Sequence, residues 1–358
     1  MTFREVTIQG APYERGLQYG KACPQEIAVS IQSYTDLLAL RRKITWAQAK
    51  TLALKYLPAI QACDPAYVEE MQGIADGAGV TFADILVLNA RSELLHTTVP
   101  ADPEDGMECT AFSAVAPATK DGVVLAGQTW DFSLAQRAAV IALRIKGEGD
   151  RPTILMFPEA GMIGGKGMNS AGLSLTLNAL RTKEHGDGLP VHLRMRRILE
   201  CTTLNQAYEQ AVRGAMPSAA NLMMTHKDGV ALDVELDPSG IDVLLPQRGV
   251  LVHTNHFLGP KNLLTHDHAG SGSTYIRLQR AQQLFFDQQA LTVEHAQAAF
   301  RDHKGYPTSI CAHPTNPANP VTVAQNATNF GLVMDLTHLE AWLAWGNPCE
   351  NPFVKITV

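Results

Sequence analysis

The stretch from residue 105 to residue 115, DGMECTAFSAV, places a cysteine where a polar run gives way to an apolar one. Cys109 would therefore open a β-strand rather than interrupt one. A cysteine becomes a good nucleophile when a base removes its proton or a positive neighbour stabilises the thiolate. If the Glu108–Cys109 bond were cleaved, the new α-amino group, with a pKa of about 7.7 to 8.0, would lie beside the sulfur as a base. The alternative is that Cys109 is simply the first core residue of its strand.

Two further segments carry residues that could assist a nucleophile. Asp131 ends a strand in GQTWDF and could hold an amine or an arginine by charge-assisted hydrogen bonds. Asn255 follows an apolar strand in VHTNHF, and its amide could donate to an oxyanion. Taken singly, Asp131 could equally be a turn aspartate and Asn255 a satisfied loop amide.

The candidates for substrate binding are weaker. Arg277 and Arg280 lie three residues apart on a predicted helix and could hold a substrate carboxylate, although such pairs commonly form a solvated face. Asn178 ends the glycine-rich segment GMIGGKGMNSAGLSLTLN, which lacks the strand–GxGxxG–helix order of a phosphate-binding loop. Tight turns around a site are expected there instead, so Asn178 and Arg277 are candidate substrate-binding residues.

Histidines gather between residues 253 and 268. His253, His256, His266 and His268, together with Asp267, could ligate zinc and so support a metal-dependent hydrolase. Their spacing matches no metal motif such as HExxH on a helix, and hydrogen-bonded or surface histidines account for it better. The six cysteines form no CxxC pair, which argues against a disulfide framework and against a thiolate zinc site. We therefore predict no metal and no resident cofactor, with a metal hydrolase and a non-enzymatic binding protein as the alternatives.

The elements that must position these residues fall into separate groups. Apolar residues recur at helical spacing over 25–42 and 46–60, so the first hundred residues are predicted to be helical. Thr81 and Asp84 have the spacing of a capping box before a further helix. The segment 97–108 has two prolines and four acidic residues without periodicity, which is typical of an exposed loop.

Short β-like runs dominate from Cys109 onward and return in the tail from Pro320 to Val358. Helical patterns interrupt them at 190–201, 204–213, 273–289 and 292–303. Strands that are grouped apart from helices favour a layered α+β fold over alternating βαβ units. No internal repeat or linker is visible, so we predict one domain over residues 1–358.

Composition and charge exclude several classes of protein. The chain of 358 residues has 46% hydrophobic and 18% charged residues, which excludes a disordered chain. A net charge of −6 gives no broad attraction to nucleic acid or to an anionic membrane surface. The N-terminal segment does not read as a secretory signal, and no window approaches the roughly 18 apolar residues of a membrane span. We therefore expect a cytoplasmic protein.

An ordered series of motifs resembles a known family. The segments GAPYERGLQYG, ECTAF, GQTWDF, EAGMIGGKGMNSAGLSLTLNAL, VHTNHF and GYPTSIC resemble the acyl-coenzyme A:6-aminopenicillanic acid acyltransferase family, also called isopenicillin N acyltransferases. The match runs in the same order from about residue 8 to past Cys311. This family belongs to the N-terminal-nucleophile (Ntn) hydrolases, which cut themselves ahead of the nucleophile. The resemblance implies a four-layer αββα sandwich with two stacked antiparallel sheets and a helix-rich N-terminal segment.

The resemblance also implies roles for individual residues. Cys109 would be both the autoproteolytic and the catalytic residue, so cleavage would leave an α fragment, 1–108, bound to a β fragment, 109–358. The aspartate of the family's WD motif falls on Asp131, and the oxyanion asparagine of its HTNH motif falls on Asn255. The serine of YPFSIC-like sequences, tied to processing of the precursor, falls on Ser309.

The chain departs from the fungal enzymes at two positions. It has Glu108 where they carry glycine before the cysteine, and Asp237 where they carry a serine. The implied activity is hydrolysis or transfer of the acyl group of a small amide through a thioester on Cys109. The family name allows acyl-coenzyme A as the acyl donor, although no segment resembles a coenzyme A site. The expected partners are a small amide or acyl donor and the two fragments of the chain, and a homo-oligomer is allowed.

Overall fold

The computed structural model of the chain describes residues 3–96, 108–182, 184, 186–260, 272–288, 290–318 and 322–358. Seven helices form most of the N-terminal segment: α1 (Pro12–Ala22), α2 (Pro24–Arg42), α3 (Trp46–Ala53), α4 (Leu57–Cys63), α5 (Pro65–Ala78), α6 (Phe82–Asn89) and α7 (Arg91–His96). The predicted capping box is confirmed, because the Thr81 hydroxyl accepts from the Asp84 backbone and the Asp84 carboxylate accepts from the Thr81 backbone. The predicted loop 97–108 lies outside the described residues except for Glu108.

Helices α1 and α5 pack backbone against backbone through glycines. A Cβ atom added to Gly16 would lie 2.1 Å from the Glu70 carbonyl oxygen, and one added to Gly73 would lie 2.2 Å from the Tyr13 carbonyl oxygen. Each helix carries a second glycine one turn further on, Gly20 in α1, with equally close contacts. The absence of side chains at these positions therefore allows the close approach of the two helices.

Eight strands form the first sheet. In spatial order they are β1 (Arg4–Ile8), β4 (Ile141–Ile145), β5 (Ile154–Met156), β6 (Gly167–Asn169), β7 (Leu173–Ala179), β8 (Ala220–His226), β9 (Val230–Asp237) and β10 (Gly240–Leu244). All neighbours are antiparallel except β1 and β4, which are parallel. Strand β1 corrects the prediction of an all-helical start, because Val6 and Ile8 alternate with exposed residues and turn toward the core.

Six antiparallel strands form the second sheet. In spatial order they are β11 (Val250–His253), β2 (Glu108–Ala114), β3 (Leu125–Ser133), β12 (Asn326–Asp335), β13 (Glu340–Trp345) and β14 (Val354–Thr357). Every residue of β3 is buried, which is expected of a strand that is covered on both faces. Short 3₁₀ turns occur at Leu54–Tyr56, Lys120–Gly122, Leu134–Ala139 and Thr322–Ala324.

The two sheets face each other, and polar side chains form hydrogen bonds across the interface. Gln128 of β3 accepts a 2.8 Å hydrogen bond from the backbone N–H of Leu177 in β7. The Thr225 hydroxyl of β8 donates to the Ser113 hydroxyl of β2 at 2.8 Å. Because side chains of both sheets meet in this way, the core between them is partly polar.

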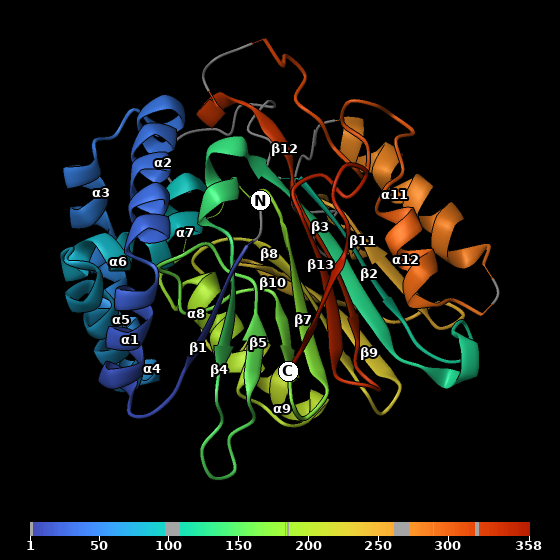
Figure 1. Ribbon diagram of the computed structural model, residues 1–358, viewed down its shortest axis with the longest axis horizontal. Coiled ribbons are helices and arrows are strands. Elements are labelled where there is room, and N and C mark those ends of the chain that lie inside the picture. Colours follow the sequence, from blue (N-terminus) through green and yellow to red (C-terminus); the bar gives the residue numbers. More distant parts are fainter. Residues whose placement is uncertain are drawn as a thin grey trace.

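Helices cover the outer faces of both sheets. The first sheet is covered by α8 (Val191–Leu199) and α9 (Leu204–Val212), and the second by α11 (Gly272–Phe286) and α12 (Val293–Ala299). Phe112 of β2 stacks on Phe285 of α11 with ring centroids 4.3 Å apart. Helices α1 to α7 gather on the side of the molecule opposite to α11 and α12 (Figure 1). The expected α+β fold with αββα layers is therefore confirmed.

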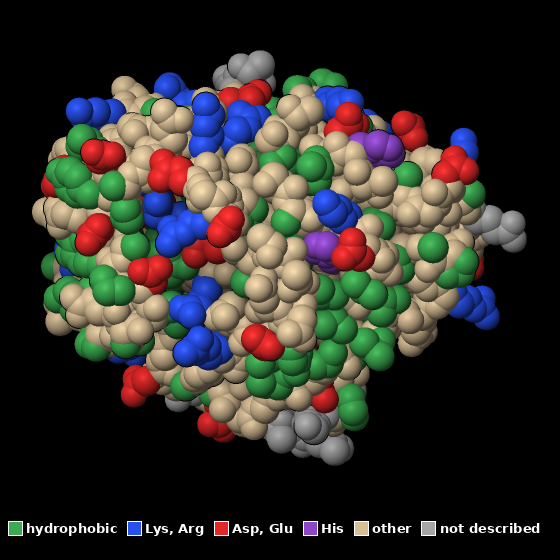
Figure 2. Space-filling view, turned by 90° about the horizontal axis from the view of Figure 1, so that it is seen from below, with side chains coloured by type: hydrophobic (Ala, Val, Ile, Leu, Met, Phe, Trp, Pro, Cys, Tyr) green, Lys and Arg blue, Asp and Glu red, His purple; other side chains and the backbone are tan. Residues whose placement is uncertain are grey.

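Two structural features concern binding to nucleic acid and to membranes, against which the composition argued. Acidic and basic side chains are interspersed on the face shown in Figure 2, in keeping with the modest net charge of −6. Among the helices that the structure describes, none has the length and apolar character needed to cross a membrane.

Candidate active site

Cys109 is the second residue of β2 and its side chain is fully buried. Its backbone N–H donates to Oδ1 of Asn255 at 2.7 Å. Burial raises the pKa of the Cys109 thiol to about 12, against the opposing effect of the positive charge on Lys166. At neutral pH the sulfur is therefore a thiol rather than a thiolate.

Asn255 connects three elements around this cysteine. It lies two residues after β11, and its backbone N–H donates to the Thr274 hydroxyl of α11 at 2.9 Å. Its side-chain Nδ2 donates to the Ala179 carbonyl at the end of β7 at 3.0 Å. Because an asparagine Nδ2 carries two hydrogens, the bond to Ala179 uses one of them. The amide thus holds the Cys109 nitrogen through Oδ1 and presents Nδ2 on its other side.

Asp131 lies on β3 directly opposite Glu108 in the strand register. Its Oδ1 accepts a 2.6 Å hydrogen bond from the Thr328 hydroxyl, whereas its buried Oδ2 has no hydrogen-bond partner among the residues that the structure describes. Burial raises the pKa of the Asp131 carboxyl to about 8, although the Arg277 charge and the Thr328 bond oppose the rise. The carboxyl is therefore largely protonated at neutral pH.

Arg277 is fully buried and reaches Cys109 from α11. Its guanidinium donates to the Cys109 carbonyl at 2.6 Å, to the Thr110 hydroxyl at 3.2 Å and to Asn255 Oδ1 at 3.1 Å. Its Nε lies 3.7 Å from a carboxylate oxygen of Glu108. Sequence reasoning gave Arg277 only a weak role in substrate binding. In the structure it contacts both residues that the Glu108–Cys109 bond joins.

The predicted partner of Arg277 lies elsewhere. Arg280 forms an ion pair with Asp302 at 2.8 Å near the surface, so the two arginines do not act on a common group. Glu108, in contrast, is held at the site, because the Ser273 hydroxyl donates to its carboxylate at 2.5 Å.

Asn178 and Ser309 are buried but make their bonds away from Cys109. The Asn178 amide donates to the His253 carbonyl at 3.5 Å and accepts from Asn221 at 3.2 Å, so it bridges the two sheets. The Ser309 hydroxyl donates to the Cys311 carbonyl within its own loop at 2.7 Å. Their predicted roles in substrate binding and processing stay predictions.

The histidine segment is only partly described. His253 is fully buried, with Nε2 2.9 Å from a carboxylate oxygen of Glu235, and His256 contacts the Thr274 hydroxyl at 2.9 Å. Each of these two histidines thus bonds to protein groups of its own. His266, Asp267 and His268 lie outside the described residues.

Two buried cations near Cys109 were missed by sequence reasoning. Lys166 lies in the glycine-rich segment, and its Nζ is 2.9 Å from the ring centroid of Trp130, which pairs with Cys109 in the sheet. Burial lowers the pKa of Lys166 to about 7. Arg91 lies over the same ring, 5.4 Å from its centroid. A lysine among glycines in an apolar run was the available signal, but nothing in the spacing connected it with Cys109.

A small cavity adjoins these residues. It measures about 10 Å³, which is close to the space of one water molecule. Its lining residues come from both sheets and from α7 and α8: Arg91, Ser92, Trp130, Leu177, Ala179, Val191, Ala219 and Ala220. Its polar wall is formed by Arg91 and Ser92, so a polar group could enter beside Trp130.

Comparison with known proteins gives the same family in two ways. A family model described as acyl-coenzyme A:6-aminopenicillanic acid acyl-transferase matches residues 118–350. The acyl-coenzyme A:6-aminopenicillanic-acid-acyltransferase 40 kDa form of Emericella nidulans is 34% identical over 354 residues, which cover 97% of this chain and 93% of that protein. An uncharacterized protein of Archaeoglobus fulgidus is 24% identical over 95% of this chain and 63% of its own length.

Solved structures are more distant. The Caenorhabditis elegans ortholog of N-acylethanolamine-hydrolyzing acid amidase has a TM-score of 0.44 and 17% identity, covering 64% of this chain and 93% of its own. Penicillin V acylase from Agrobacterium tumefaciens has a TM-score of 0.44 and 14% identity, covering 66% and 83%. The assignment rests instead on the family model and the Emericella relative, which both span most of the sequence. The chain belongs to the acyl-coenzyme A:6-aminopenicillanic acid acyl-transferase family, and is thus an enzyme of acyl-group chemistry on amides.

Proposed function

We propose that this chain is a self-processing cysteine enzyme that hydrolyses or transfers the acyl group of a small amide. The observation that carries the proposal is the 2.7 Å hydrogen bond from the Cys109 N–H to Asn255 Oδ1, made at the point where the chain would be cut. Any buried backbone N–H requires an acceptor, and here the acceptor is a side chain held by two other elements. After cleavage the same acceptor would orient the new α-amine so that its lone pair is directed at the sulfur.

Cleavage of the precursor would use the groups around the Glu108–Cys109 bond. The Cys109 sulfur, which is hydrogen-bonded to the backbone of Asp131, attacks the Glu108 carbonyl carbon and gives up its proton, which the Cys109 nitrogen accepts in the next step. The C–N bond then breaks and the Cys109 nitrogen takes a proton, so a thioester replaces the peptide bond. Water hydrolyses this thioester, which leaves a carboxylate on Glu108 and a free amine on Cys109. Arg277 supports this step because it holds the Cys109 carbonyl at 2.6 Å.

In the mature enzyme the free amine of Cys109 would be the base. It takes the thiol proton while the sulfur attacks the carbonyl of a bound amide. The second Nδ2 hydrogen of Asn255 would donate to the resulting oxyanion, a contribution worth about 2.7 to 4 kcal/mol in enzymes that use such a donor. The amine returns its proton to the leaving nitrogen, and a thioester remains on Cys109. Water or a second amine resolves it.

The acyl donor follows from the family relationship. The Emericella relative is named as an acyl-coenzyme A:6-aminopenicillanic-acid-acyltransferase, so we propose a small amide or an acyl-coenzyme A thioester as donor. Both present a carbonyl that a thiolate can attack, and both pass through the same thioester on Cys109. No resident cofactor takes part in these steps.

The two fragments would remain associated. Residues 1–108 carry β1, which pairs with β4 in the first sheet, as well as helices α1 to α7. Residues 109–358 carry the other strands, apart from Glu108 at the start of β2. Cleavage therefore divides one fold rather than separating two domains.

Intact-mass measurement of freshly purified protein tests the processing step. We expect two fragments, the larger beginning at Cys109, from the wild type and from the control Cys63→Ser, which changes a half-buried cysteine on another element. We expect one uncut chain of 38.8 kDa from Cys109→Ala. A wild-type chain that stays intact would refute the proposal. Incubation of the processed enzyme with amides and hydroxylamine then tests for the thioester, because hydroxylamine captures the acyl group.

A further inference from the structure

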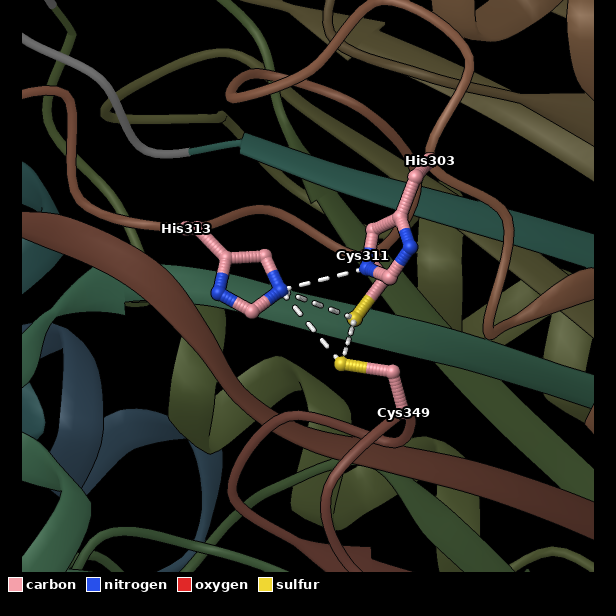
Figure 3. A group of neighbouring side chains, drawn as sticks. All are labelled: His303, Cys311, His313 and Cys349. Atoms are coloured by element: carbon pink, nitrogen blue, oxygen red, sulfur yellow. Dashed lines mark hydrogen bonds between the residues drawn. The ribbon is translucent and has the colours of Figure 1, made fainter.

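Two cysteines and two histidines converge away from Cys109, at the edge formed by the loop after α12 and the segment after β13. His303, Cys311 and His313 belong to the loop, and Cys349 belongs to the segment. Figure 3 shows that their side chains point toward one another. One possible ligand atom from each residue lies within 4.8 Å of all the others. The fold thus brings together two cysteines and two histidines that lie up to 46 positions apart in the sequence.

Four of the six distances between these atoms resemble the edges of a metal-centred tetrahedron, and the other two are at most 4.8 Å. The two histidine Nε2 atoms are 3.2 Å apart, and the sulfurs of Cys311 and Cys349 are 3.4 Å apart. His313 Nε2 lies 3.8 Å from the first sulfur and 3.4 Å from the second. Zinc bond lengths of about 2.3 Å to sulfur and about 2.0 to 2.1 Å to nitrogen imply edges of about 3.3 Å (N to N), 3.6 Å (N to S) and 3.8 Å (S to S).

We infer that His303, Cys311, His313 and Cys349 form a zinc site. Four protein ligands close the tetrahedron, which is the pattern of a structural rather than a catalytic zinc. Binding would release one proton from each thiol, so that two thiolates balance the two charges of the ion. The carboxylate of Glu350 lies 3.8 Å from the other ring nitrogen, Nδ1, of His313. A carboxylate that accepts a hydrogen bond from this nitrogen is the usual orienting partner of a ligating histidine, and Glu350 is near enough to make that bond after a side-chain rotation.

Neither a disulfide nor a hydrogen-bonded cluster fits these four side chains as well as a metal ion does. A disulfide requires about 2.05 Å between the sulfurs, whereas the sulfurs of Cys311 and Cys349 are 3.4 Å apart and both cysteines are free. In a hydrogen-bonded cluster the facing Nε2 atoms of His303 and His313 share one proton, and the remaining contacts rely on thiols, which are weak donors. A cation instead accepts one lone pair from each of the four ligand atoms.

The zinc would brace the loop against the second sheet. Ala312, between two of the ligands, donates its N–H to the Thr328 hydroxyl at 2.8 Å and accepts from the Asn347 amide at 2.6 Å. The same Thr328 hydroxyl donates to Asp131 at 2.6 Å. The site therefore lies two hydrogen bonds from Asp131, and its part would be to hold Thr328 in place rather than to touch a substrate.

Metal analysis of the full-length protein tests this inference without any assay of activity. The protein is purified without chelator, and zinc is measured by mass spectrometry and by release to a colorimetric chelator. We expect one zinc per chain, a lower melting temperature after zinc removal, and recovery when zinc alone is added. Substitution by Co²⁺ should give the visible absorption of tetrahedral thiolate coordination.

Variants of the two exposed ligands locate the metal. Cys349→Ser and His303→Asn should each weaken zinc binding more than about 100-fold, because loss of an outer partner alone costs about 10- to 100-fold. The matched controls Cys63→Ser and His338→Asn should keep one zinc. Zinc-free protein with two free thiols, a Cys311–Cys349 disulfide in non-reduced peptides, or full zinc in Cys349→Ser would each overturn the inference. None of these outcomes depends on whether the chain is cut at Cys109.

Discussion

Replacing Asp131 by asparagine should stabilise the uncleaved protein at alkaline pH. The Asp131 pKa is raised to about 8 in the folded chain, against about 3.9 in an unfolded one. Between these values the folded state keeps a proton that the unfolded state has lost, so each pH unit costs about 1.4 kcal/mol of stability. The cost is nearly absent below pH 4 and reaches about 5.6 kcal/mol above pH 8. Asparagine does not titrate, so the variant avoids this cost.

The measurement compares urea unfolding at pH 5 and pH 8 in a Cys109→Ala parent, which prevents cleavage. Relative to the parent, Asp131→Asn should gain about 3 to 4 kcal/mol more at pH 8 than at pH 5. Any cost of burying the new amide hydrogens is the same at both pH values, so the difference isolates the ionisation. Asp36→Asn, which changes an aspartate away from the site, is the control and should shift by less than about 1 kcal/mol. An equally small shift for Asp131→Asn would mean that the carboxylate is ionised in the folded chain, and the reasoning would fail.

Three further outcomes are expected. Lys166→Met should stabilise the chain most at pH 7 and below and lose this gain as the pH approaches 10, because burial lowers the Lys166 pKa to about 7; urea unfolding at pH 7 and pH 10 checks the sign. Arg277→Lys keeps the charge but loses the forked contact with Cys109 and Asn255, and should slow fragment formation about tenfold or more on a gel time course. Gly73→Ala should cost about 1 to 3 kcal/mol by overpacking α1 against α5, whereas Gly272→Ala, which meets nothing within 4 Å, should cost much less in the same assay.

Local patterns in the sequence predicted most of the fold. The apolar spacing over 25–42 and 204–213 predicted α2 and α9 closely, because a helix with one buried face repeats its apolar residues every three to four positions. Strand β1 escaped this reasoning, since five residues with only Val6 and Ile8 facing inward give too short a pattern beside the long helices that follow. The predicted helix over 46–60 is interrupted at Leu54–Tyr56, where the chain turns into α4 at Pro58.

Sequence motifs pointed to only part of the candidate site. Asp131 and Asn255 stood out as polar residues near predicted strand ends, and the fold places Asn255 at the Cys109 nitrogen and Asp131 opposite Glu108. Their catalytic roles stay predictions. Arg277 looked like half of a surface pair, and only the packing of α11 against β2 shows that it turns inward. The Cys₂His₂ cluster was missed for a similar reason, because Cys349 reaches the other three ligands through the antiparallel pairing of β12 and β13, which no spacing along the chain encodes.

The parallel pairing of β1 with β4 has a consequence for a molecule cut at residue 108. The pairing of Arg4–Ile8 with β4 holds the fragment 1–108 in the first sheet. The cut therefore leaves the native fold intact, but refolding of the cut protein becomes a bimolecular reaction. After heating and cooling, the cut protein should refold only as fast as its two fragments associate, so its refolding should be faster at higher protein concentration. Refolding of the uncut protein should not depend on concentration in this way. A molecule that loses the fragment 1–108 exposes the edge of β4, which can pair with another chain and so promote aggregation.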